Sequence, residues 1–265
     1  VSGANSFVCG QENELQDTIG DYNIMVGISN IIPENNVDYA AVFGNSCTGG
    51  ARGSLSWGRN NSNDPDYNGS GYGAVGGSGN LTSGASYGLT VGDDNLGAEE
   101  FNAGIQMGKN GASQNTIVGA LTTSAGMFAA KGDAQLTTNL VLRGQTTDDV
   151  ATVIYNDGGI ANEWDLAAND TVLVKCVVLG RKTGDAGQSA AYELIASFKN
   201  QGGTSTIGTT GVTKVVLNED TGTTDYDATL AVNDTRDTWE LQVTGDSGHT
   251  VNWMAEAQVI KLNIA

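Results

Sequence analysis

The chain has 265 residues, with 38 Gly, only 2 Pro and a hydrophobic fraction of 39%. Turn-forming residues outnumber long helix formers, which predicts an all-β protein with a thin core. The formal net charge is −18, from 12 basic and 30 acidic residues. Such a surface repels phosphates and anionic lipids, so we expect no nucleic-acid partner and no membrane insertion.

The N-terminal half repeats a short apolar run that ends on a glycine. Apolar residues two apart, followed by a turn glycine, predict a short strand with one buried face. A strand that recurs about every 15 residues, with no room for helices, predicts a parallel β-roll or solenoid. The pattern fails at Lys131, so the predicted solenoid domain covers residues 1–133. The glycines that end the runs are Gly10, Gly27, Gly44, Gly58, Gly76, Gly92, Gly108, Gly119 and Gly132.

The runs also predict which side chains are buried. We expect the residues one and three before the glycine, such as Val26 and Ile24, to point into the coil. The middle residue, such as Met25 or Val42, should point away from it, yet it is apolar in several repeats. Strands that are apolar on both faces are normally covered on both faces. The pattern therefore predicts an oligomer in which the second face packs against another chain.

From residue 134 the strands lengthen and the turn signals move further apart. Residues Val172, Val174, Cys176 and Val178 alternate onto one face. This pattern predicts an antiparallel β-sandwich, jelly-roll-like, over residues 134–265. The expected strands are Thr138–Arg143, Val150–Tyr155, Thr171–Lys182, Ala190–Lys199, Thr213–Leu217, Ala228–Val232, Thr238–Thr244 and Thr250–Leu262.

The cysteines Cys9, Cys47 and Cys176 form no CxxC pair, so they predict neither a zinc site nor a disulfide framework. We expect Cys9 and Cys176 to be small core residues. The Gly-Asp-Ser-Gly sequence before His249 is similar to the nucleophile motif of trypsin-like proteases. This histidine lies two residues after Ser247, too close for a catalytic triad, so the motif predicts a turn.

Acidic clusters leave two alternatives open. They stand at residues 93–94, 99–100 and 219–227, where paired carboxylates could act as a glycosidase acid and base or hold a calcium ion. Nothing in their spacing distinguishes these roles from solvated turns. We therefore expect no enzyme activity, no catalytic residue, no metal and no cofactor.

The four tryptophans divide into two groups. Trp57, Trp239 and Trp253 occupy apolar strand positions and are expected in the core. Trp164 lies in a polar stretch with Asn162 and Asp165, which together offer an aromatic face, an amide and a carboxylate. Sugars present an apolar CH face and a rim of hydroxyls, so this cluster is the predicted ligand-binding site.

Two segments resemble the head repeats of trimeric autotransporter adhesins, which recur in fibres of tailed bacteriophages: residues 83–92 (SGASYGLTVG) and 111–119 (GASQNTIVG). The resemblance implies a parallel β-roll in which three chains pack about a common axis. The C-terminal half, with residues 239–245 leading into residues 251–255, resembles the β-sandwich tips of viral fibres. The absence of heptads and membrane strands favours a virus over a bacterial adhesin.

These expectations combine into one hypothesis, a homotrimeric fibre or receptor-binding protein on the virion surface. Its tip would bind a host surface glycan or envelope protein, and its N-terminal side would contact other virion proteins. The alternatives are a bacterial surface adhesin, a glycan-cleaving tailspike and a purely structural virion protein. The chain begins at Val1 without methionine, which predicts a processed product or the C-terminal piece of a longer protein.

Overall fold

The structure is a computed structural model that describes residues 5–16, 22–32, 39–49, 53–63, 73–82, 88–97, 104–112, 119–156, 164–184, 187–223 and 225–263. The described residues are all-β, as the composition predicts. The chain divides into two compact units. Unit 1 contains Val1–Thr116 and Leu121–Ala134, and unit 2 contains Ile117–Ala120 and Gln135–Ala265.

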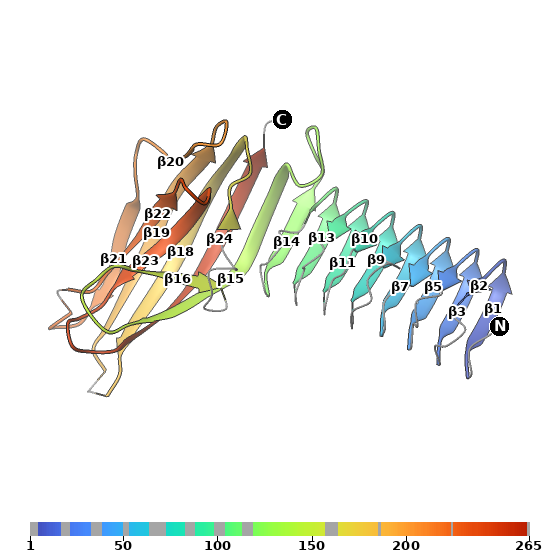
Figure 1. Cartoon of the computed structure of the whole chain (residues 1–265), viewed down its shortest axis with the longest axis horizontal. Helices are drawn as coiled ribbons and strands as arrows, with labels where there is room; N and C mark the ends of the chain where they lie inside the picture. The colour runs from blue at the N-terminus through green and yellow to red at the C-terminus, as the bar shows by residue number, and fades with distance from the viewer. Residues whose placement is uncertain are drawn as a thin grey trace. The chain divides into compact units, whose positions relative to one another are not determined.

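Unit 1 is a β-solenoid, which confirms that prediction. Successive turns stack as parallel strands in two sheets, and Figure 1 shows these strands following one another in sequence order. The first sheet contains the five-residue strands β1 (Phe7–Gln11), β3 (Ile24–Ile28), β5 (Ala41–Asn45), β7 (Leu55–Arg59), β9 (Ala74–Ser78), β11 (Leu89–Asp93), β13 (Ile105–Lys109) and β14 (Leu121–Ala125). The second sheet contains the two-residue strands β2 (Glu14–Leu15), β4 (Ile31–Ile32), β6 (Thr48–Gly49), β8 (Ser62–Asn63), β10 (Leu81–Thr82) and β12 (Leu96–Gly97).

The recurring glycine has a steric cause. Gly27 pairs in register with Gly10 and Gly44, and its φ is +131°. A Cβ atom at Gly27 would lie 1.9 Å from the carbonyl oxygen of Gly44 in the next turn. Only glycine therefore allows neighbouring turns to approach this closely while the backbone bends.

Three of the predicted turn glycines were placed wrongly. In the fifth repeat Gly77, not Gly76, pairs with Gly58 and Gly92. In the last strand Ser124 occupies this register position opposite Gly108, so Gly119 and Gly132 do not end strands. The spacing rule failed at these positions because a second glycine or an irregular turn shifted the register by one or more residues.

The prediction of which side chains enter the coil is also wrong. The middle residues of the runs are buried, including Met25, Val42 and Val75 at 0% exposure, whereas Phe7 is 57% exposed and Ile24 is 41% exposed. Alternation leaves one inward side chain among the first three strand residues. That position holds polar residues in several turns, and the larger apolar residues of those turns lie on the outward side of the strand. We call this outward side the outer apolar face, formed by Phe7, Ile24, Phe43, Leu55, Ile105 and Met107.

Two residues expected in the core of unit 1 follow the same inversion. Cys9 is exposed on β1. Trp57 is half-buried on the outward side of β7, where its ring covers Gly76 in the next turn. A Cβ atom at Gly76 would lie 1.9 Å from Cε2 of that ring. Because Gly76 has no side chain, the indole of Trp57 can pack over it on the outward side.

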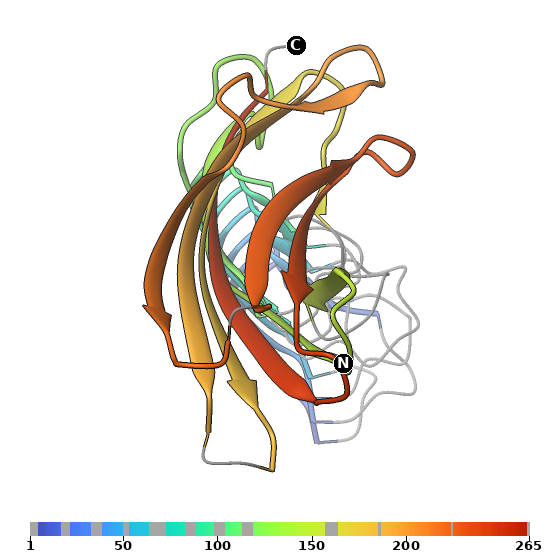
Figure 2. The same cartoon turned by 90° about the vertical axis from the view of Figure 1, so that its left-hand side faces the viewer.

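Unit 2 consists of antiparallel strands. The large sheet runs in the order β21, β19, β18, β24 and β15, and a smaller set pairs β22, β23, β16 and β17. The longer members are β15 (Ala134–Thr146), β18 (Asp170–Lys182), β19 (Ser189–Asn200) and β24 (Val251–Asn263). The shorter members are β16 (Thr152–Asn156), β17 (Trp164–Asp165), β20 (Ser205–Ile207), β21 (Thr213–Glu219), β22 (Asp227–Asn233) and β23 (Thr238–Thr244). Figure 2 shows the long strands curving around the β22–β23 hairpin.

The alternation expected for unit 2 is present. Val172, Val174, Cys176 and Val178 share one core with residues of β23 such as Leu241. Trp239 and Trp253 also belong to that core, at 4% and 2% exposure. The opposite side of the large sheet is the outer sheet face, which exposes Leu173, Val177, Leu179, Met254, Ile260 and Leu262. The two short strands β17 and β20 were not predicted.

Candidate functional site

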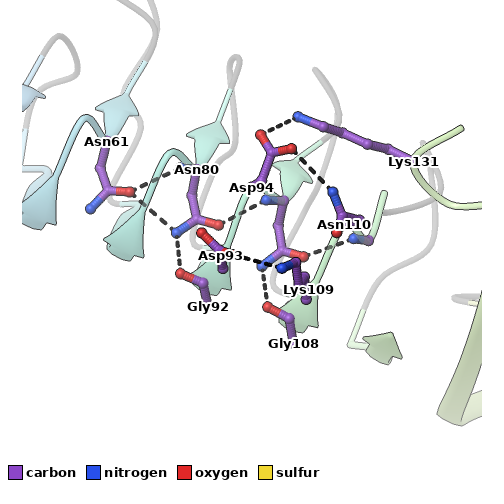
Figure 3. Close-up of polar contacts among 11 residues, drawn as sticks. Asn61, Asn80, Gly92, Asp93, Asp94, Gly108, Lys109, Asn110 and Lys131 are labelled. Atoms are coloured by element: carbon purple, nitrogen blue, oxygen red, sulfur yellow. Dashed lines mark hydrogen bonds and ion pairs between the residues drawn. The ribbon is translucent and has the colours of Figure 1, made fainter. Parts of the chain in front are cut away.

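A row of asparagines supports the coil at the corner that follows the turn glycine. Each asparagine stands three residues after that glycine, and Figure 3 shows Asn61 and Asn80 in consecutive turns. The Nδ2 of Asn80 donates to the carbonyls of Gly76 at 2.7 Å and Gly92 at 2.9 Å. Its Oδ1 accepts the backbone N–H of Asn95 at 2.9 Å. We call this row the asparagine ladder, formed by Asn13, Asn30, Asn61, Asn80 and Asn95.

The ladder is structural, because each amide satisfies backbone groups that the tight corner leaves unpaired. It is interrupted at Cys47, the equivalent residue of the third turn, which is buried. The sequence analysis missed this row, although the spacing Gly-x-x-Asn recurs in five turns and would have revealed it.

The acidic residues 93–94 lie beside this ladder and are paired with cations. Asp94 accepts from Lys131 Nζ at 2.6 Å and from Asn110 Nδ2 at 3.1 Å (Figure 3). Asp93 lies 3.4 Å from Lys109 Nζ. Each of the two carboxylates thus faces an ammonium group of its own. This cluster is therefore a set of surface ion pairs.

The other acidic clusters give no catalytic pair within the described residues. Residues 99–100 lie outside the described ranges. Asp220 accepts the backbone N–H and the hydroxyl of Ser189, both at 2.8 Å, and these bonds lower the pKa of Asp220. Glu219 accepts the hydroxyl of Tyr192 at 2.9 Å. These contacts fasten the end of β21 to β19.

The structure describes two of the three residues of the predicted sugar-binding cluster. Trp164 is 3% exposed and belongs to the core of unit 2, so its ring offers no free face to a sugar. Asp165 is exposed on the same short strand. Asn162 lies outside the described residues. Of the two described members, Trp164 is buried and Asp165 is exposed.

A different carboxylate lies near Asp165. Although Asp165 is exposed, partial desolvation of its carboxyl group raises its pKa, and the negative charge of Asp237 raises the pKa further. The Asp237 carboxylate accepts the hydroxyl of Ser205 at 2.7 Å. Thr238 pairs with Asp165 across the strands and is 1% exposed, and its Oγ1 has no hydrogen-bond partner among the described residues.

The Gly-Asp-Ser-Gly segment forms the expected turn. His249 Nδ1 lies 2.8 Å from the Asp246 carboxylate, and its backbone N–H donates to the Asp246 carbonyl. Ser247 has no described contact with this histidine. Searching the described ranges finds no group of three or more His, Cys, Asp or Glu residues that could hold a metal ion. Nor do these ranges contain a helix long and apolar enough to cross a membrane.

The fold defines a β-solenoid protein with an antiparallel C-terminal unit. No protein-family model and no curated protein sequence matches the chain. Among solved structures it is similar to the tailspike protein of Acinetobacter baumannii phage AM24, with 11% identity and a TM-score of 0.28, covering 98% of this chain and 57% of that one. It is also similar to gp49 of Acinetobacter baumannii bacteriophage Fri1, with 11% identity and a TM-score of 0.27, covering 92% of this chain and 49% of that one. The chain thus spans about half the length of these tailspikes.

One sequence-based expectation is contradicted by these comparisons. We expected no enzyme activity, but the Fri1 tailspike is a capsular polysaccharide depolymerase. The expectation rested on the lack of a resolvable carboxylate pair in the sequence. Asp165 and Asp237 stand 72 positions apart in the sequence, so no local motif could reveal them. The statement that the chain is not an enzyme is withdrawn.

Proposed function

We propose that the chain is a homotrimeric phage fibre or tailspike protein that attaches the virion to a host surface polysaccharide. The observation that supports assembly is the exposed apolar surface on each unit, the outer apolar face of unit 1 and the outer sheet face of unit 2. Soluble monomers rarely expose apolar patches of this extent, and such faces are normally covered by protein.

Copies of the same chain are the favoured cover for these faces. The outer apolar face repeats one side-chain position turn after turn, so an identical face on a parallel copy matches its spacing. The resemblance to adhesin head repeats implies three copies about one axis. In this arrangement unit 2 forms a β-sandwich tip that contacts the host, and the N-terminal side contacts other virion proteins.

Sedimentation equilibrium tests the assembly, with an expected mass three times the 27.2 kDa of one chain. Leu179→Lys places a charge on the outer sheet face and should weaken the trimer, whereas Thr210→Lys changes an exposed polar residue in a turn of the same unit and serves as the control. The wild-type trimer should co-sediment with host surface polysaccharide. A wild-type chain that stays monomeric at micromolar concentration contradicts assembly, and a trimer that ignores host polysaccharide contradicts the binding role.

A glycan-cleaving tailspike is the second candidate, supported by Asp165 and Asp237. An acid with a raised pKa beside an ionised carboxylate is the pairing that glycoside hydrolysis requires. Asp165 would protonate the leaving oxygen and Asp237 would act as the base or nucleophile.

Release of reducing ends from host polysaccharide tests this candidate. Activity should fall as the pH rises through the raised pKa of Asp165, because the acid must carry its proton. Asp165→Asn should reduce the rate at least 100-fold, while Asp148→Asn, an exposed carboxylate elsewhere in unit 2, should leave it unchanged. Equal rates in the Asp165→Asn and Asp148→Asn variants would show that Asp165 and Asp237 are not a catalytic pair.

A further inference from the structure

Two exposed tyrosines form a stacked pair on consecutive turns of the solenoid. Tyr22 and Tyr39 each stand two residues before the first residue of their strands, β3 and β5. Their ring centroids are 5.4 Å apart and their ring planes differ by 2°. Tyr22 is 52% exposed and Tyr39 is 62% exposed. Large aromatic side chains are thus displayed to solvent at a repeating position of the coil.

The backbone at this position is unfavourable for tyrosine. The φ angles of Tyr22 and Tyr39 are +64° and +63°, in the left-handed region that bulky residues rarely adopt. The equivalent residues before β1 and β7 are Asn5 (φ +59°) and Gly53 (φ +70°), the residue types that tolerate this conformation. The left-handed backbone of one residue costs about as much free energy as one stacked pair of rings contributes. Mutual stacking therefore does not explain why both positions hold tyrosine, and strain of this kind is typical of functional sites.

The two outer faces of the stack differ. One face of Tyr39 is covered by Tyr22, so its other face is directed toward the turn of β7. The equivalent position in that turn is Gly53, which has no side chain to cover the ring. On the opposite side, the outer face of Tyr22 is directed toward the turn of β1, where the equivalent position carries the side chain of Asn5. Among the described residues at this repeating position, Tyr39 is thus followed by a glycine, whereas Tyr22 is preceded by a residue with a side chain.

From this asymmetry we propose that the free face of Tyr39, over Gly53, binds one sugar ring of an uncharged polysaccharide. An aromatic ring at the surface stacks on the apolar CH face of a pyranose while the sugar hydroxyls stay in water. An uncharged glycan is favoured because a net charge of −18 repels acidic polymers. The site deepens the proposed attachment function and depends on it. It places glycan contact on unit 1 instead of on the loops of unit 2.

The sequence repeats this arrangement. Tyrosine also stands two residues before the strands that begin at Ala74 and Leu89, in turns whose preceding loops lie outside the described residues. The position thus holds tyrosine in four repeats of the chain. A polysaccharide repeats its sugar units, so successive units can contact aromatic rings that recur along the coil.

Binding of the full-length chain to an array of bacterial surface polysaccharides, including uncharged ones, tests the site. Tyr39→Ala removes the ring, and Gly53→Asn keeps the ring but fills the space beside it with a residue that tolerates the left-handed backbone. Each should weaken binding to the recognised glycan about tenfold. Asn5→Gly changes the same position at the far end of the stack and should bind as the wild type does.

The outcomes separate the site from the function. If the wild type binds a glycan and both variants bind it equally well, the Tyr39 site is wrong and the attachment function stands. If the wild type binds no glycan, the attachment function fails and the site fails with it. Should Tyr39→Ala or Gly53→Asn dissociate the oligomer in sedimentation, the ring is an assembly contact and the proposal is overturned. If Tyr39→Ala does not fold, the Gly53→Asn result decides.

Discussion

The two units bury their side chains in opposite ways. In unit 2 the inward positions of β18 are apolar throughout its centre, and the two long neighbours and the β22–β23 hairpin supply an aromatic core. In unit 1 the inward position changes from Met25 and Val42 to Ser56, Thr90 and Gln106, all at 0% exposure. The described apolar cluster of unit 1 lies in its first turns, around Met25, Ile32 and Val42, and Val75 is buried apart from it.

This difference shows what holds each unit together. A thick core between two layers gains stability from apolar burial, which scales with the area removed from water. A thin coil has little such area, so its stability depends more on backbone hydrogen bonds, on the asparagine ladder and on whatever covers its outer face. Substitutions in the two units should therefore fail for different reasons.

The largest expected effect contrasts two tryptophans. Trp253 is 2% exposed, donates from Nε1 to Thr146 Oγ1 at 2.9 Å and packs edge-on against Tyr226. Trp253→Ala should destabilise unit 2 by about 3–5 kcal/mol, because it leaves a large cavity. Trp57→Ala removes a half-buried ring from the surface of unit 1 and should cost about 1–2 kcal/mol. Urea unfolding of both variants measures the ratio, and equal losses would show that the two units are stabilised in the same way.

The sequence predicted the core of unit 2 better than that of unit 1 for the same reason. Alternation located Val172 to Val178 and the exact limits of β23, because a sheet with one wet face separates apolar from polar side chains. In unit 1 both faces of several strands are apolar, so alternation could not tell Ile24 from Met25. Packing against a neighbour, not polarity, decides which of them lies inside.

The candidate sites were harder to predict than the fold. Trp164 stands in a polar stretch of sequence, yet its strand pairs with Trp239 and turns the ring into the core. The pairing of β17 with β23 places Asp165 opposite Thr238, the residue that follows Asp237. The Tyr22–Tyr39 stack depends on the register of β3 and β5, which brings two tyrosines from consecutive repeats together. Contacts of this kind follow from strand pairing, which a single sequence does not specify.

The next effect tests whether unit 1 depends on its ladder. Asn80→Ala leaves the carbonyls of Gly76 and Gly92 and the N–H of Asn95 without their partner inside the coil. Unsatisfied buried groups should lower the free energy of unfolding by about 2–3 kcal/mol. Asn45→Ala is the control, since its exposed side chain only accepts from Ser46. If both variants melt at the same temperature, the ladder does not stabilise the coil.

The smallest expected effect is an increase in stability. It comes from replacing Cys47, where the asparagine ladder is interrupted, with asparagine. In the preceding turn Asn30 donates to the carbonyls of Val26 at 3.2 Å and Gly44 at 3.0 Å. Cys47→Asn should make the equivalent bonds within its own turn and to the next, and its Oδ1 should accept the backbone N–H of Asn61. The backbone N–H of residue 47 already donates to Asn30 Oδ1 at 3.0 Å. The backbone at this corner therefore already has the hydrogen bond that it makes at the other asparagines of the ladder.

We expect Cys47→Asn to raise the free energy of unfolding by about 1 kcal/mol, the usual net gain from added internal hydrogen bonds. Cys47→Ser is the matched control, because its hydroxyl is too short to bridge two turns and places a polar group in a buried site. Thermal unfolding should rank Asn above Cys and Cys above Ser. The reverse order of Asn and Cys would mean that the apolar contacts of Cys47 within the small cluster of the first turns outweigh the ladder. Unit 1 would then depend on apolar burial as unit 2 does, and the two units would differ only in how much apolar area they bury.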